Sequence, residues 1–155
     1  MRISESFVPI PLIESKDYGS AGIDSDGVDL GKLNAFSAIF VFGAITGNSV
    51  LTVYAGATAA KTTAIPFSYR LGAADYKAAN ADQLGASTAV ASTGLTLAAT
   101  TFDHRMMTIS IDPQAMPDGQ GWVTFSIDAT ASVLNIGAVG VGAGRAVGNL
   151  NPTVI

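Results

Sequence analysis

Short segments in which apolar and polar residues alternate recur along much of the chain. In residues 106–111, for example, Met107, Ile109 and Ile111 alternate with threonine and serine. A period of two residues is typical of a β-strand that buries one of its faces. From this alternation, and from branched or aromatic content, we predict strands over residues 35–42, 50–55, 65–71, 106–111, 122–128 and 132–141.

Residues 35–42 are apolar at almost every position, which predicts a central strand buried on both faces. Residues 46–49 then offer turn chemistry before the alternation of residues 50–55 begins. This succession predicts that the two strands pair as a β-hairpin. Pro66 places the next strand at a sheet edge or moves its start inward, because proline cannot donate to a sheet ladder.

The remaining segments contain turn signals and no clear amphipathic helix. Residues 72–101, rich in Ala, Ser, Thr and Gly, predict loop and short strands, and residues 117–119 (Pro-Asp-Gly) predict a turn. We therefore expect an all-β fold, an antiparallel β-sandwich or barrel-like domain. We expect this domain over residues 28–141, after an extended N-terminal arm (1–27) and before a glycine-rich, polar tail (142–155).

The predicted arm is apolar, and its two prolines, Pro9 and Pro11, argue against a helix. Its apolar cluster is too large for a solvated tail, so it should lie on its own domain or on a neighbouring molecule. We predict a protein-interaction element that consists of Phe7, Val8, Ile10, Leu12 and Ile13. Deleting residues 1–14 is expected to leave a folded β-domain that binds its partner more weakly.

Composition indicates a surface that is poor in charge. The chain has 155 residues, enough for one domain with a real core. Charged residues make up 13% of it, against roughly 25% in ordinary soluble domains. Such a surface favours contact with other chains, although many small Ala, Ser, Thr and Gly residues can also keep a surface soluble. The formal charge of −4 and the scattered basic residues disfavour nucleic-acid binding, which relies on Lys and Arg at phosphates.

Signals for disulfide bonding, export and membrane insertion are missing from the sequence. There is no cysteine, and therefore no disulfide framework or thiolate zinc site. The first residues lack the basic start and apolar core of a signal peptide, and no run approaches the roughly 18 apolar residues of a membrane span. We expect synthesis in the cytoplasm of the producing cell and no membrane partner.

His104, the one histidine, is flanked by Asp103 and Arg105, which raises the question of a catalytic triad. Adjacent residues on a strand point to opposite faces, and no G-x-S-x-G motif supplies a nucleophile. A surface histidine just before a strand accounts for the pattern equally well. We therefore predict no catalytic residue and no enzymatic activity.

Asp24, Asp26 and Asp29 lie close together beside a glycine, and clustered carboxylates can hold calcium. Their spacing is not that of an EF-hand, and no downstream glutamate stands at the bidentate position. A solvated turn is the favoured interpretation. We predict no metal site and no cofactor.

Two further groups of residues suggest ligands but favour structural roles. Residues 140–145 (Gly-Val-Gly-Ala-Gly-Arg) superficially resemble a dinucleotide-binding loop, yet too little chain follows for the required helix and strand. Their glycines favour close passage to other backbone, and Arg145 could be a phosphate ligand or an interface anchor. Trp122 and Tyr54 could stack on a sugar, but large rings at strand positions favour core packing.

Two stretches carry a resemblance to a known group of proteins: residues 35–57 (AFSAIFVFGAITGNSVLTVYAGA) and residues 116–130 (MPDGQGWVTFSIDAT). They resemble small proteins of tailed phages and prophages that are encoded beside the major capsid protein, and the likeness spans roughly residues 1–145. Both stretches are strand-and-turn sequences without a catalytic signature. The resemblance therefore transfers no functional residue.

The resemblance implies a structural protein of the virion, and in particular a decoration (cement) protein on the outer capsid surface. The partner would be the major capsid protein, and we also expect self-association, with a trimer favoured because capsids offer threefold sites. The acidic balance fits an exterior position better than contact with packaged DNA. The alternatives are a tail, connector or fibre component of the virion and, in a different class, a β-sandwich carbohydrate-binding module.

Overall fold

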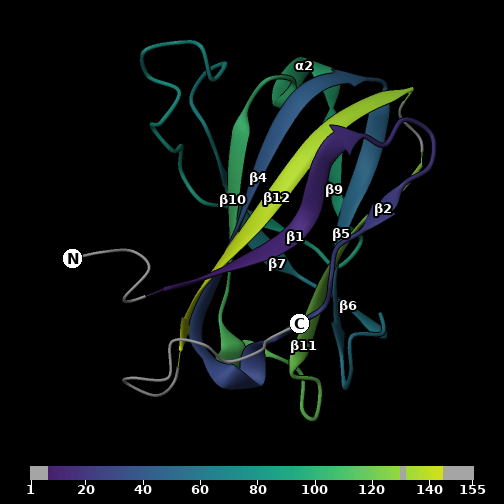
Figure 1. Cartoon of the computed structure of the whole chain (residues 1–155), viewed down its shortest axis with the longest axis vertical. Coiled ribbons are helices and arrows are strands. Elements are labelled where there is room, and N and C mark those ends of the chain that lie inside the picture. The colour runs from purple at the N-terminus through teal and green to yellow at the C-terminus, as the bar shows by residue number, and fades with distance from the viewer. Residues whose placement is uncertain (1–6, 130–131, 145–155) are drawn as a thin grey trace.

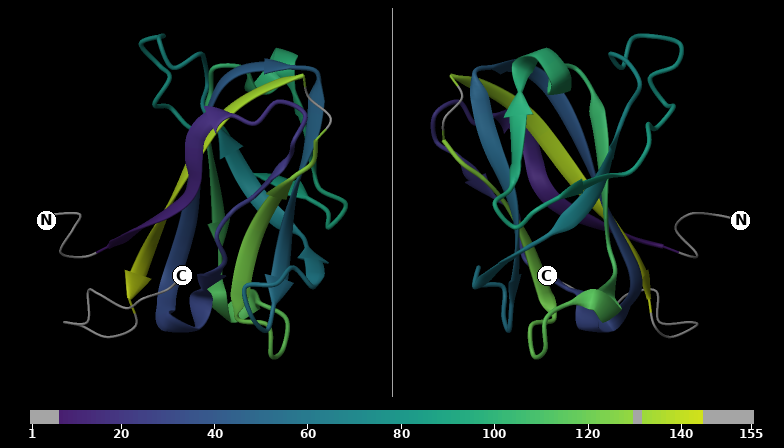
Figure 2. Two further views of the ribbon diagram at one scale, coloured as in Figure 1. Left: turned by 45° about the vertical axis from the view of Figure 1, so that its right-hand side comes forward. Right: turned by 180° about the vertical axis from the view of Figure 1, so that it is seen from behind.

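The computed structural model describes residues 7–129 and 132–144, and the elements found there are almost all β-strands. They form two antiparallel sheets, which Figures 1 and 2 show as two packed layers. Sheet A has the spatial order β1 (Val8–Asp17), β12 (Val133–Gly144), β4 (Leu33–Thr46), β10 (Met106–Ile111), β7 (Phe67–Leu71) and β8 (Thr88–Val90). Sheet B has the order β2 (Ile23–Asp24), β11 (Trp122–Ile127), β5 (Asn48–Gly56) and β6 (Thr63–Ile65), with β3 (Val28–Asp29) also paired to β11 and β9 (Leu95–Ala98) to β5. The predicted antiparallel β-sandwich is confirmed.

The helical segments within the described residues are short, and they are η1 (Leu30–Lys32), α2 (Ala99–Phe102) and η2 (Pro113–Ala115). None of these helices has the length and apolar character needed to cross a membrane. Each 3-10 helix follows an aspartate, Asp29 or Asp112, whose side chain accepts a backbone hydrogen bond from the helix. These caps satisfy N–H groups that have no partner within the helix.

The core lies between the sheets and is rich in phenylalanine. Phe36, Phe40 and Phe42 of β4 are at most 2% exposed. The Phe40 ring meets the Phe125 ring of β11 edge-on, with 5.3 Å between the ring centroids, so the two sheets contact each other directly. The residues predicted to face inward from β10 and β11 are buried as well: Met107, Ile109, Ile111, Val123, Phe125 and Ile127.

The strand β4 differs from prediction in its environment and in its partner. Its second face is partly open to solvent, with Val41 49% exposed, so the predicted burial on both faces is wrong. The predicted hairpin is also wrong, because β4 pairs with β12 and β10 in sheet A whereas β5 pairs with β11 in sheet B. The chain passes from one sheet to the other at Gly47, where φ is +90°. Strands from later in the chain occupy both edges of β4, and β5 therefore joins the opposite sheet.

Pro66 divides the strand that was expected over residues 65–71. β6 ends at Ile65 and pairs with β5, whereas β7 begins at Phe67 and pairs with β10 in the other sheet. Because proline has no N–H to give to a ladder, it suits the crossing between the sheets. Phe67 and Tyr69 share the inner face of β7, as predicted.

The residues expected to form an extended arm supply the edge strand of sheet A. β1 pairs with β12 from Val8 to Asp17, with two irregularities in register. Ile10, Leu12 and Ile13 are 1%, 4% and 7% exposed. Burial in the protein's own core therefore explains the apolar cluster of this segment.

The predicted domain boundaries are corrected accordingly. The sheets begin with β1, well before the boundary expected at residues 27 and 28, and β2 adds residues from the predicted arm to sheet B. At the other end, β12 continues past residue 141 to Gly144. The rest of the predicted tail, residues 145–155, lies outside the described residues.

A long loop, residues 72–85, projects beside one end of the sandwich (Figure 2). Two backbone hydrogen bonds attach it to the chain near the start of β10. Gly72 N–H donates to the Met106 carbonyl at 2.7 Å, and Tyr76 N–H donates to the His104 carbonyl at 2.9 Å. The loop thereby brings Tyr76 next to His104.

Candidate functional site

The face of sheet A that points away from the core carries apolar side chains in cross-strand register. Pro11 of β1 lies opposite Val139 of β12, which lies opposite Ile39 of β4. Directly opposed residues of antiparallel strands project from the same face. With the neighbouring rows, the sheet A outer face is formed by Pro9, Pro11, Ile39, Val41, Met106, Val139 and Val141.

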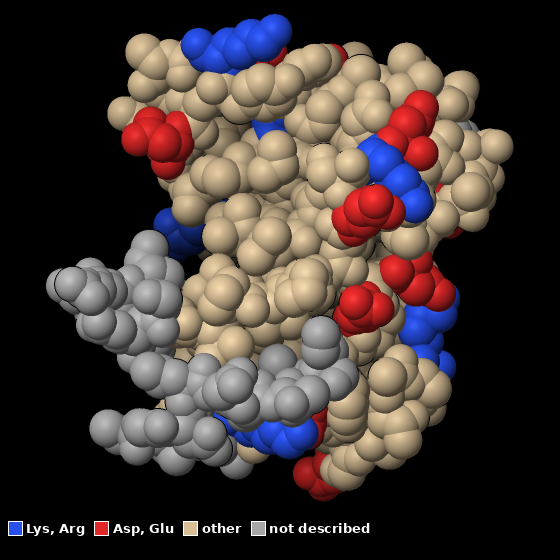
Figure 3. Space-filling view, viewed as in Figure 1, with Lys and Arg blue, Asp and Glu red and all other residues tan. Residues whose placement is uncertain are grey.

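Several of these apolar side chains are open to solvent. Val41 and Val139 are 49% and 47% exposed. Figure 3 views this face and shows a tan surface across its middle, with Lys, Arg, Asp and Glu gathered toward the edges. The surface is hollowed around the two valines, and the hollow, of about 490 Å³, is also lined by Ile13, Ser15 and Ile39. Such a concave aliphatic surface can accept an apolar side chain of another protein.

The apolar surface ends on β10, where polar residues follow Met106. Thr108 lies opposite Arg70, and Ser110 lies opposite Ser68, so polar side chains replace aliphatic ones. At this border the Ser110 and Ser37 hydroxyl oxygens are 2.9 Å apart and share a hydrogen bond. An exposed apolar patch with a polar rim is typical of a surface that contacts another protein.

The edge of this face is protected against extension of the sheet. Pro9 and Pro11 stand on β1, the edge strand, and prolines make an edge a poor template for a further strand. Next to it, Gly137 of β12 has no side chain, and a Cβ there would come within 2.9 Å of Ser15 Cβ. The glycine therefore lets β1 pack closely. A partner would contact the face of the sheet and would not add a strand to its edge.

The structure places the five residues of the predicted interaction element differently. Ile10, Leu12 and Ile13 are buried in the core of their own domain, the first of the two locations that the sequence left open, and they do not extend from it as a free arm. Phe7 and Val8 are partly buried, and Val8 packs against the same core. Pro9, Pro11 and Ser15 are exposed positions of β1, and Ser15 also lines the hollow. The cluster therefore stabilises the fold first, because three of its five side chains are removed from water.

His104 lies in a turn and not on a strand. Its φ is +54°, in the left-handed region, between α2 and β10. In this turn His104 Nδ1 lies 3.1 Å from Asp103 Oδ1, which also accepts a hydrogen bond from Ile45 N–H. The prediction that the two side chains point to opposite faces is therefore wrong. The imidazole also stacks on the Tyr76 ring, with 5.5 Å between centroids, and among the described residues it is hydrogen-bonded to no serine or threonine hydroxyl.

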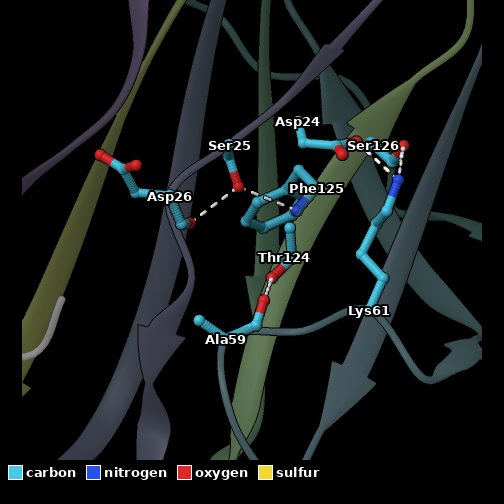
Figure 4. A network of polar contacts seen from close by, with 8 residues as sticks. All are labelled: Asp24, Ser25, Asp26, Ala59, Lys61, Thr124, Phe125 and Ser126. Carbon is cyan, nitrogen blue, oxygen red and sulfur yellow. Dashed lines mark hydrogen bonds and ion pairs between the residues drawn. The ribbon is translucent and has the colours of Figure 1, made fainter.

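Two of the three clustered aspartates, Asp24 and Asp29, have separate partners. Asp24 Oδ1 accepts hydrogen bonds from Lys61 Nζ at 2.8 Å and from Ser126 Oγ at 2.6 Å (Figure 4). Partial burial by itself would raise the pKa of Asp24, but the two hydrogen bonds and the charge of Lys61 outweigh it and hold this pKa below its usual 3.8. Asp29 instead caps η1 and pairs with Lys32. In the part of the chain that the structure describes, no three His, Asp or Glu side chains lie together as a metal site.

Trp122 and Tyr54 lie on the outer face of sheet B, so the prediction that they pack in the core is wrong. Both are partly exposed and alternate with the buried residues of β11 and β5. Residues 57–62 lie against this face: Thr124 Oγ1 donates to the Ala59 carbonyl at 3.3 Å, as Figure 4 shows, and Lys61 Nζ lies 5.5 Å from the Tyr54 ring centroid. The Tyr54 ring is thus a neighbour of a lysine within the same chain.

The glycine-rich residues 140–144 form part of a strand and not a nucleotide-binding loop. A Cβ on Gly140 would come within 2.7 Å of the Phe36 ring, and one on Gly142 within 2.8 Å of Leu33. The expected close passage is found, but the close neighbours are core side chains and not backbone. Arg145 lies outside the described residues.

The sheet A outer face was not predicted, although its signal is present in the sequence. Ile39 and Val41 alternate with the buried phenylalanines of β4. A strand with apolar side chains on both faces is predicted to be buried on both. In β4 the face with Ile39 and Val41 lies at the surface. Low charge predicts contact with other chains but does not tell which face makes it.

Comparisons with known proteins do not assign a family to the chain. No protein-family model matches it, and no curated protein matches it. Among solved structures, the SPBc2 prophage-derived protein YomS is similar over 88% of this chain and 93% of that chain, with 13% identity and a TM-score of 0.47. A structure of infectious bursal disease virus, Gx strain, covers 88% of this chain and 39% of its own, with 12% identity and a TM-score of 0.24. A structure of the VP2 subviral particle of infectious bursal disease virus covers 88% and 40%, with 12% identity and a TM-score of 0.22.

Proposed function

We propose that this chain is a structural protein of a tailed-phage virion, and that it decorates the outer surface of the capsid by binding the major capsid protein through the sheet A outer face. The observation that carries the proposal is the exposed, uncharged aliphatic surface around Ile39, Val41 and Val139. Covering an aliphatic side chain of this size contributes roughly 1.5 to 3 kcal/mol before ordering costs. Several such side chains on one rigid sheet favour attachment to another surface.

Two further features support this proposal. The stretches that resemble phage proteins form β4, β5 and β11, the central strands of the two sheets, so the resemblance lies on the scaffold. The net charge of −4 favours an exterior position, because contact with packaged DNA would need clustered Lys and Arg. We also propose a role without catalysis or a cofactor, in which binding alone is the activity.

The decisive experiment adds charge to the centre of the sheet A outer face. Purified wild-type chain, Val41→Lys and Val139→Lys are mixed with shells assembled from the major capsid protein of the same genome, and bound chain is measured after sedimentation. We expect each lysine to weaken binding at least about tenfold, because a charge would be buried without a partner. Leu84→Lys is the matched control, since Leu84 is 39% exposed on the loop 72–85 and does not line the apolar hollow.

The two outcomes of this experiment separate clearly. Both positions are exposed, so the variants should fold with stabilities within about 1 kcal/mol of wild type. If folded Val41→Lys and Val139→Lys bind shells as the wild type does, the sheet A outer face is not the docking surface. If the wild type does not bind shells and labelled chain is found on tails, connectors or fibres by electron microscopy, the decoration role is wrong.

A further inference from the structure

A second hollow opens beside the sheet A outer face, where β4 meets the loop 72–85. It has a volume of about 580 Å³ and is lined by Lys16, Val41, Gly43, Tyr76, His104 and Asn135, among others. It borders the apolar hollow, since Val41 lines both. Its character is different, because an aromatic ring and polar side chains replace the aliphatic ones.

One wall of this hollow is an aromatic platform fixed by the backbone. The Tyr76 and His104 rings are stacked, with 5.5 Å between their centroids and 30° between their planes. Tyr76 N–H donates to the His104 carbonyl at 2.9 Å, and His104 N–H donates to the Gly43 carbonyl at 3.1 Å. Tyr76 nevertheless stays 47% exposed. A large ring held firmly and left open to solvent is suited to receive a ligand.

The conformation of His104 is a second, independent observation. A residue with φ near +54° at the end of a short helix is most easily a glycine, which has no Cβ to crowd the backbone. Here the position carries an imidazole whose Nδ1 is held by Asp103. Strained residues of this kind concentrate at functional sites, where the surrounding structure keeps them in place.

The polar groups of the hollow favour an uncharged ligand. The Asn135 side-chain amide and His104 Nε2 make no hydrogen bond to any other described residue, so both remain available. The lysine that lines the hollow, Lys16, already bonds Glu14 Oε2 at 2.9 Å, which compensates its charge. An anionic ligand would need an uncompensated cation.

Gly43 keeps this part of the hollow open. A Cβ on Gly43 would come within 2.9 Å of Asn135 Cβ, so a larger residue would displace the asparagine. The absence of a side chain at Gly43 therefore leaves space for the Asn135 side chain in the wall of the hollow. The result is a shallow site with a flat ring and an amide side chain in its walls.

We propose that this hollow is a binding site for an uncharged sugar ring of a glycan. The C–H face of a sugar packs on the Tyr76 ring, while its hydroxyl groups hydrogen-bond to the Asn135 amide and donate to His104 Nε2, the acceptor nitrogen of a neutral imidazole whose Nδ1–H faces Asp103. The site is open, so the ring can belong to a longer chain. This activity is separate from capsid binding and does not depend on it.

The test is a titration of the ¹⁵N-labelled full chain, without capsid protein, with neutral oligosaccharides at millimolar concentration. Maltohexaose, cellohexaose, laminarihexaose, mannohexaose and chitohexaose are the probes, and amide signals report the position of binding. We expect at least one probe to shift the signals of Gly43, Tyr76, His104 and Asn135 in a saturable way. Tyr76→Ala should weaken that binding about tenfold or more, whereas Tyr76→Phe keeps the ring and should change it about twofold at most.

Leu84→Ala is the matched control, because Leu84 is exposed on the same loop but does not line the hollow. Its binding should equal that of the wild type. The proposal is overturned if no neutral probe shifts these signals, or if folded Tyr76→Ala binds as tightly as Tyr76→Phe. It is also overturned if only an acidic polysaccharide such as alginate binds there, because the ligand would then be charged.

Discussion

At the residue scale, His104 holds two segments together in an unfavourable backbone conformation. A positive φ costs roughly 1 to 2 kcal/mol for a residue with a Cβ. The conformation is kept because the N–H of His104 donates to Gly43 and its carbonyl accepts from Tyr76. The backbone of this turn therefore joins the loop 72–85 to β4, and the stacking of the imidazole on Tyr76 adds to this contact.

We expect the free energy of unfolding to be about 1 kcal/mol higher for His104→Gly than for His104→Ala. Both variants lose the imidazole, but only glycine relieves the strain at positive φ. Urea-induced unfolding of the two variants, followed by tryptophan fluorescence, measures the difference. An alanine variant as stable as the glycine variant would show that the turn is not strained.

Asp24 predicts a dependence of stability on pH. The folded-state pKa lies below the usual 3.8, so ionised Asp24 stabilises the protein above about pH 3.8, and this contribution is lost as the pH falls through the lower, folded-state pKa. Because the Asp24 side chain is 50% exposed, solvent screening limits the contribution to at most about 1 kcal/mol.

Lys61→Met should therefore lower stability at neutral pH and make little difference once Asp24 is protonated. Urea denaturation at a series of pH values between 2 and 7 gives the free energy of unfolding of the wild type and of Lys61→Met. Lys77→Met, in the loop 72–85, is the control for the loss of a lysine charge. A Lys61→Met deficit that stays constant down to pH 2 would mean that the ion pair does not stabilise the fold.

At the element scale, β1 is a structural edge strand whose two faces have different roles. Its buried residues Ile10, Leu12 and Ile13 join the core, and its exposed prolines border the sheet A outer face. Burying each of the three side chains contributes roughly 1.5 to 3 kcal/mol. Their sum is comparable to the whole stability of a typical domain, about 5 to 15 kcal/mol.

Deleting residues 1–14 is therefore expected to unfold the domain. The sequence alone had led us to expect that the truncated domain would stay folded. A single Ile10→Ala change should lower the free energy of unfolding by about 2 to 5 kcal/mol, because it leaves a cavity in the core. Thermal unfolding measured by circular dichroism tests both, with Pro9→Ala, at an exposed position, as the control. Cooperative unfolding of the truncated chain at the wild-type temperature would contradict the assignment of β1 to the core.

At the scale of the whole molecule, the uncharged face predicts self-association as well as binding to a capsid. Closed rotational symmetry buries the same patch on every subunit, and a trimer would match the threefold sites of a capsid. We expect sedimentation velocity at micromolar concentration to give about three times the 15.7 kDa of one chain. Val139→Lys should shift the population toward monomer. A wild-type chain that sediments as a clean monomer contradicts a preformed trimer.

The sequence by itself determined the fold class and several of the strands, because these depend on local alternation, whereas β1 was expected as an arm. Residues 106–111 were predicted as a strand and form β10 with the same bounds, since Met107, Ile109 and Ile111 need only one core to face. The turn at Gly119, where φ is +73°, follows equally from local residue chemistry. Individual candidate residues such as His104 were also visible in the sequence.

Only the tertiary structure decided which strands pair and which side chains share a face. β4 takes its neighbours from β10 and β12, about 70 and 100 residues later, so the nearby β5 joins the other sheet. The register of those distant strands sets Pro11, Val139 and Ile39 in one row. Tyr76 reaches His104 for the same reason, because backbone hydrogen bonds between separate segments hold the loop there. Periodicity specifies that a residue lies on a face, but long-range pairing specifies which other residues lie beside it.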